Sequence, residues 1–245
     1  MQKAHYIRLE RVSVWCGVVL MVGFLAAFAI GHITPPMSPT ESPEDIVTFL
    51  KDHRTGILTC VALMVLLVPF EYPYVVVTSL QLRRVEGGWG LLSMIQLTTG
   101  VVAPLGFFFP LAILAAAAYR PGLHSADVLS AMTDMFWLMF VGNACIFVLQ
   151  VWSIGYASFI DHRAEPIFPR WYGWLSMLLG VLLIPGAFVF LNQTGPLAWN
   201  GLLAYALPSV AYFIWKIATP WVLLQAVRSE EKEIAETAEA RPVTV

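Results

Sequence analysis

Long runs without charged residues alternate with short charged segments along this chain. Each run is long enough to supply the roughly 20 apolar residues that a helix needs to cross a membrane. The uncharged run Trp171 to Trp215 is too long for one crossing, and turn-forming residues in "LNQTGPLAWNG" (191–201) divide it. Six transmembrane helices are therefore predicted, at about 12–33, 55–82, 87–119, 129–160, 171–190 and 202–227.

This pattern predicts an all-α membrane bundle with little mass outside the bilayer. Only 12% of the 245 residues are charged, whereas a soluble domain carries about 25%. The formal net charge is −2 and no basic stripe is present, which excludes nucleic acid as an expected partner. The lipid bilayer is the partner that this composition indicates.

Lysine and arginine are distributed unequally between the predicted loops. With the N-terminus inside, the inner segments hold ten of the 14 basic residues, the outer segments hold three, and Lys216 lies within the sixth span. The positive-inside rule therefore predicts a cytoplasmic N-terminus (1–11), a six-helix domain (12–227) and a cytoplasmic charged tail (228–245).

The longest outer loop contains a helix-start signal. Ser42 is followed by Pro43, Glu44 and Asp45, the order of an N-cap, an N1 proline and acids in the first turn. A short outer helix between the first two spans is expected here.

Metal and cofactor sites are not predicted. The three cysteines lie in apolar runs at different expected depths, and the five histidines lie at span ends or in loops. His32, His53 and His124 share the outer side, but their spacing matches no known metal motif.

The segment "VPFEYPY" (68–74) places Glu71 between Pro69 and Pro73 inside the second span. Each proline lacks the N–H that would bond to the carbonyl four residues earlier, so the helix should be kinked beside a carboxylate. Irregular backbone at this depth is tolerated only where it is buried in protein or lines a cavity.

Lys216 is the expected partner of Glu71. Each of these residues lies 12 positions from the arginine that ends its own span, Arg83 or Arg228. At 1.5 Å per residue both lie about 18 Å from the inner boundary, and opposite charges at one depth tend to pair. Pro220 is expected to kink the sixth span near Lys216.

Four further polar residues complete the candidate ligand-binding site. Tyr72 and Tyr74 flank the notch formed at the two prolines and can supply hydroxyl donors. Asn143 and Gln150 are seven residues apart in the fourth span, hence on one face of a regular helix, where interhelical hydrogen bonding is the simpler interpretation.

Three functions remain open. The first is binding or transport of a hydrophobic or amphipathic small molecule at the kinked, charged notch, as broken helices mark sites in transporters. The second is an enzyme acting on a lipid or isoprenoid, with Glu71 as general acid. The third is an accessory or structural subunit of a larger membrane complex. Six helices is a small number for the first function, so a homo-oligomer is an open alternative there. No catalytic sequence motif decides whether the protein is an enzyme.

Three segments, "PPMSP", "FPRWYGW" and "TGPLAWNG", resemble a family of small actinobacterial and proteobacterial multi-pass proteins. The resemblance covers most of the chain, carries no established function and does not include "VPFEYPY". It implies a bacterial inner-membrane protein.

Overall fold

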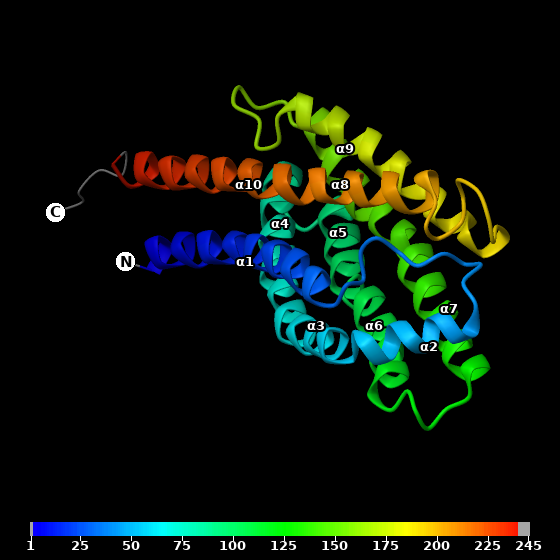
Figure 1. Ribbon diagram of the computed structural model, residues 1–245. Coiled ribbons are helices and arrows are strands. Elements are labelled where there is room, and N and C mark those ends of the chain that lie inside the picture. The colour runs from blue at the N-terminus through cyan, green and yellow to red at the C-terminus, as the bar shows by residue number, and fades with distance from the viewer. Residues whose placement is uncertain (1, 240–245) are drawn as a thin grey trace.

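The computed structural model describes residues 2–239, and the side chains of residues 5–236, as an entirely helical structure (Figure 1). The remaining residues of the expected tail, 240–245, lie outside the described part of the chain. The elements are α1 (Gln2–Ile30), α2 (Pro43–Asp52), α3 (Arg54–Leu67), η1 (Val68–Phe70), α4 (Glu71–Glu86), α5 (Leu91–Val102), α6 (Leu105–Tyr119), α7 (Ala126–Gly142), η2 (Asn143–Phe147), α8 (Val148–Ile160), α9 (Arg170–Leu183), η3 (Ile184–Leu191), η4 (Leu202–Ala206) and α10 (Leu207–Glu239).

These elements form six rods in the described part of the chain, each long and apolar enough to span a membrane. The prediction of six such helices is therefore confirmed. The rods cover His5–Ile30, Arg54–Glu86, Leu91–Tyr119, Ala126–Ile160, Arg170–Leu191 and Leu202–Glu236.

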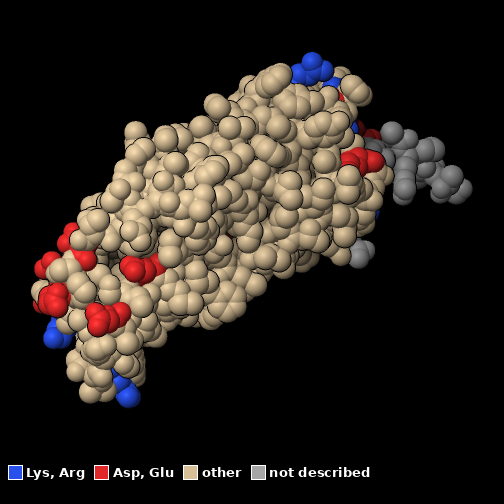
Figure 2. All heavy atoms as spheres, turned by 90° about the vertical axis from the view of Figure 1, so that its right-hand side faces the viewer, with Lys and Arg blue, Asp and Glu red and all other residues tan. Residues whose placement is uncertain are grey.

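Charged side chains gather at the two ends of the molecule and leave a broad uncharged belt between them (Figure 2). Large apolar side chains on the rods, such as Trp15, Val22 and Leu66, are about half exposed or more. An apolar surface of this extent is unfavourable in water and matches the hydrocarbon core of a bilayer.

Several rods are interrupted where the sequence disfavours a regular α-helix. Pro69 lies in the 3₁₀ turn η1, and Pro185 lies in the 3₁₀ segment η3. Proline cannot donate the i→i−4 hydrogen bond, so the helix tightens or bends at these positions.

Two helix ends differ from the boundaries expected from the apolar runs. The first helix stops at Ile30, and His32 has a positive φ of 52°. The third rod begins only at Leu91, because Gly87 ends α4 in the left-handed conformation (φ 73°). The Glu86 carboxylate accepts hydrogen bonds of 2.9 Å from the backbone N–H groups of Leu92 and Ser93, which caps the new helix.

The short helix predicted after Ser42 is present as α2. The Ser42 hydroxyl accepts from the Asp45 N–H at 3.2 Å and donates to the Asp45 carboxylate at 2.6 Å. Ile46 and Leu50 form the buried face of α2, which packs against α7. These contacts attach the loop between the first two rods to the bundle.

Ser42→Ala is expected to destabilise α2 by about 1 kcal/mol, because the cap of the first turn is lost. Hydrogen exchange of the α2 amides should become faster while that of α7 is unchanged. Ser42→Thr keeps the hydroxyl and is the matched control; equal exchange in the alanine and threonine variants would contradict this role of Ser42.

The end of the bundle that carries the termini is held by a polar network that joins α1, α4 and α10. Gln81 of α4 donates to Glu10 of α1 at 2.9 Å and to Glu230 of α10 at 2.8 Å. Arg84 donates to both carboxylate oxygens of Glu233 at 2.9 Å, and Arg11 pairs with Glu231. We call these contacts the terminal clamp. It fixes α1 and α10 side by side at this end (Figure 1).

Helices α8 and α9 approach each other closely through small residues. A Cβ on Gly173 would lie 3.1 Å from the Gly155 carbonyl oxygen, and a Cβ on Gly155 would lie 3.2 Å from that of Gly173. Ser158 and Ser176 are buried beside this crossing. Small residues that let backbones meet are a common basis of helix packing in membranes.

Candidate functional site

Glu71 lies at the break in the second rod, as the first residue of α4 directly after η1. The residue is buried, with 4% of its surface exposed. The interruption at Pro69 thus coincides with a carboxylate turned toward the protein interior rather than toward the surface.

Lys216 of α10 meets this carboxylate. Its Nζ atom lies 2.5 Å from Oε1 and 2.7 Å from Oε2 of Glu71. Only 1% of the Lys216 surface is exposed, so the salt bridge is excluded from solvent. Both residues lie well inside their rods, Arg54–Glu86 and Leu202–Glu236.

Three aromatic rings surround the Lys216 ammonium group. Its Nζ atom lies 4.5 Å from the ring centroid of Tyr74, 5.2 Å from that of Trp215 and 5.7 Å from that of Tyr212. The quadrupoles of these rings attract the cation and offset part of the free-energy cost of removing it from water.

Almost no free space remains beside the salt bridge. A void of about 10 Å³ touches Glu71 and is otherwise lined by apolar residues, among them Phe107 and Phe147. A void of this size holds at most about one water molecule. Space for an organic ligand therefore lies elsewhere.

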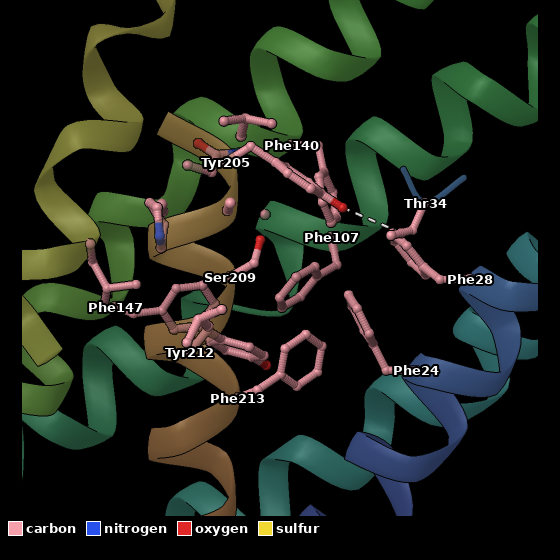
Figure 3. A pocket seen from close by; sticks show the side chains of 18 of the residues that line it. Phe24, Phe28, Thr34, Phe107, Phe140, Phe147, Tyr205, Ser209, Tyr212 and Phe213 are labelled. Atoms are coloured by element: carbon pink, nitrogen blue, oxygen red, sulfur yellow. Dashed lines mark hydrogen bonds between the residues drawn. The ribbon is translucent and has the colours of Figure 1, made fainter. Parts of the chain in front are cut away.

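A much larger cavity, of about 550 Å³, is lined by residues in the half of the bundle away from the termini. Figure 3 shows it from close by. We call it the aromatic cavity. Its walls come from α1, α6, α7, η2, η4 and α10, with single contributions from the α1–α2 loop and from α9. The aromatic residues that line it are Phe24, Phe28, Phe107, Phe140, Phe147, Tyr205, Tyr212 and Phe213.

The aromatic rings of the cavity also pack against one another. The centroids of Phe24 and Phe28 are 4.3 Å apart in a stacked arrangement, and Phe24 meets Phe107 edge to face at 5.5 Å. Phe107 in turn lies 6.0 Å from Tyr212. Such mutual contacts hold the rings in place and favour a preformed cavity over a collapsed one.

The aromatic cavity reaches the surface between α1 and α10. Leu25 of α1 and Val210 of α10 both line it, and they are 50% and 56% exposed. The opening therefore lies on the side of the bundle, within the uncharged belt. The adjacent Tyr205 hydroxyl and Thr34 hydroxyl form a hydrogen bond of 3.3 Å, shown as a dashed line in Figure 3.

Aromatic side chains separate this cavity from the Glu71–Lys216 salt bridge. Phe107 and Phe147 line both the aromatic cavity and the small void beside Glu71, with ring centroids 5.7 Å apart. Tyr212 lines the cavity and also lies near the Lys216 ammonium group. The charged pair is thus next to the cavity without forming part of its wall.

The other residues of the predicted site are dispersed. Tyr74 lies beneath Lys216, whereas Tyr72 is 37% exposed on the outside of the bundle. Asn143 lines the aromatic cavity. Gln150 is fully buried away from the cavity, next to Gly100 of α5.

The separation of Asn143 from Gln150 follows from the 3₁₀ segment η2, which begins at Asn143. In a regular α-helix, side chains seven residues apart point in directions that differ by only about 20° around the helix axis. When the first five of these steps are 3₁₀ turns, the Asn143 and Gln150 side chains point about 80° apart. The assumption of one regular helix in the fourth span therefore does not hold.

Histidines and acids form no larger cluster in the described residues. The rings of His32 and His53 lie 4.6 Å apart near the end of α1, and His53 also packs against Phe49. Within residues 5–236, no group of three or more His, Cys, Asp or Glu side chains is close enough to hold a metal ion.

Comparisons with protein-family models, with curated proteins and with solved structures find no match. The family resemblance based on the three short segments therefore stays a prediction. The functional conclusion rests on the aromatic cavity and its surroundings.

Proposed function

We propose that this protein binds an apolar small molecule in the aromatic cavity. The observation that carries the proposal is the cavity itself: about 550 Å³, lined mainly by aromatic and aliphatic side chains, and open between α1 and α10. Ligand pockets typically measure about 300–1,000 Å³ and are lined mainly by apolar groups with a few polar ones. A side opening within an apolar belt suits a molecule that enters from lipid.

The expected setting is a bacterial inner membrane, with both termini in the cytoplasm. The excess of lysine and arginine at the end that carries the termini supports this orientation. The aromatic cavity would then lie in the outer half of the bilayer.

Catalysis by Glu71 as a general acid is less well supported. A general acid must reach the leaving group of its substrate, but both carboxylate oxygens of Glu71 already accept hydrogen bonds from the Lys216 ammonium group. The void beside Glu71 also has no room for a substrate. We therefore assign the salt bridge to the support of the cavity's inner wall.

Gly106→Leu tests the proposal, because Gly106 lines the cavity and the atoms nearest to an added Cβ belong to Asn143, at an ordinary contact distance of 3.7 Å. A methyl-sized group fits at this position, and the rest of the leucine side chain extends into the cavity. The probe is N-phenyl-1-naphthylamine, whose fluorescence rises in apolar surroundings. Protein in nanodiscs should bind it saturably above empty nanodiscs, and Gly106→Leu should weaken binding at least tenfold.

Ala112→Leu adds a larger side chain to an exposed position of the same helix and is the matched control. Its affinity for the probe should equal that of the unmodified protein. The proposal fails if binding does not exceed that of empty nanodiscs, or if Gly106→Leu and Ala112→Leu bind equally well.

A further inference from the structure

We infer that the ligand of the aromatic cavity is an uncharged molecule with a ring system that carries a ketone group. This inference rests on the proposed function and specifies the chemistry of its ligand. Three features of the cavity carry it: the absence of charge from its lining, the hydrogen-bond donors that it leaves without partners, and its aromatic walls.

The first feature concerns charge. All residues that line the cavity are described, and none is charged. The nearest ionised groups noted above, Glu71 and Lys216, are already neutralised by each other and lie behind Phe107 and Tyr212. A charged ligand would lose its hydration without gaining a counter-ion, which is strongly unfavourable. A neutral ligand avoids this cost.

The second feature is a set of polar groups that lack partners. The hydroxyls of Ser209 and Tyr212 and the side-chain amide of Asn143 line the cavity, and none forms a hydrogen bond with another described residue. Tyr205 and Thr34, in contrast, satisfy each other. Polar groups in apolar surroundings are stable when hydrogen-bonded, so these three select a ligand with a complementary group.

The chemistry of these groups suits an acceptor on the ligand. Ser209 and Tyr212 are three residues apart on α10 and thus share one face of the helix. Figure 3 shows the Ser209 hydroxyl among the labelled aromatic rings. Each of the three groups can donate a hydrogen bond through an O–H or N–H, and a ketone oxygen can accept one or two such hydrogen bonds.

The third feature is the flat, aromatic character of the remaining walls. Phe24 and Phe28 from α1 and Phe213 from α10 present rings to the cavity, and Phe24 lies 5.9 Å from Phe213 in an edge-to-face arrangement. Such walls favour a ring system that stacks or packs edge to face over a flexible alkyl chain, which would lose more conformational freedom on binding.

Three naphthalenes of similar size test the inference: 2-acetylnaphthalene carries the ketone, 2-ethylnaphthalene lacks the oxygen, and 2-naphthoate is charged at pH 7. Binding to protein in nanodiscs is quantified by chromatography after separation, with empty nanodiscs and Gly106→Leu as blanks. The ketone should bind about 3- to 10-fold more tightly than the hydrocarbon, the gain expected for one hydrogen bond. The carboxylate should bind at least tenfold more weakly than the ketone.

Ser209→Ala and Tyr212→Phe should reduce the preference for the ketone while affinity for 2-ethylnaphthalene is unchanged. Ser153→Ala is the control, because the Ser153 hydroxyl donates to Leu149 O and does not line the cavity. Equal affinities for ketone and hydrocarbon, or tightest binding of the carboxylate, would overturn the inference while leaving the proposed function intact. Absence of binding by all three probes would overturn both.

Discussion

Lys216→Met is expected to lower the free energy of unfolding by about 3–5 kcal/mol, because it leaves the Glu71 carboxylate buried without a counter-ion. The salt bridge is almost fully enclosed, so water cannot replace the lost ammonium group. Denaturation in mixed micelles, followed by tryptophan fluorescence, measures the effect. Trp215 lies next to Lys216 and should report the change directly.

The double variant Glu71→Leu with Lys216→Met separates the cost of an unpaired charge from the value of the pair. Replacement of a buried ion pair by apolar residues of similar volume is often neutral or stabilising, so the double variant should recover most of the stability lost in Lys216→Met. If the double variant is as unstable as the single one, the pair contributes a net attraction that apolar packing does not replace.

Gly173→Leu is expected to destabilise the protein by about 3 kcal/mol, the upper part of the usual range for overpacking. A Cβ at this position would already lie 2.9 Å from Ser158 Cβ and 3.1 Å from the Gly155 carbonyl oxygen, so α8 and α9 must move apart. The same denaturation assay measures the loss.

Gly122→Leu is the matched control for this substitution. Gly122 has no atom within 4 Å of an added Cβ, so the change in stability there should stay within about 0.5 kcal/mol. A similar loss in both variants would show that removal of a glycine, rather than the close approach of α8 and α9, determines the result.

Much of the fold could be predicted because membrane-spanning helices need long apolar runs, and these are visible in the sequence. Six such runs correspond to six rods, and the cap at Ser42 correctly marked α2. The breaks were predicted only where proline causes them, as at Pro69. The 3₁₀ segment that begins at Asn143 contains no proline and was not foreseen.

The candidate site was predictable only through its charges. Glu71 and Lys216 stand out in apolar runs, and their equal distances from Arg83 and Arg228 suggested a common depth; their side chains lie 2.5 Å apart. The aromatic cavity gave no comparable signal. Phe107 lines it while Phe108 and Phe109 beside it are exposed, and helices that are apolar on every face do not reveal which face turns inward.

The terminal clamp has a mechanical consequence for α1 and α10. The two helices are tied together at the end that carries Arg11 and Glu231, whereas the cavity separates them near Leu25 and Val210. The part of α1 from Arg11 to Ala29 is about 27 Å long. A tilt of α1 by about 5° around the terminal clamp would therefore displace the Ala29 end of the helix by about 2 Å. At that far end the Phe24–Phe213 ring contact and the Thr34–Tyr205 hydrogen bond hold the two helices, so widening the opening breaks these weaker contacts while the terminal clamp stays closed.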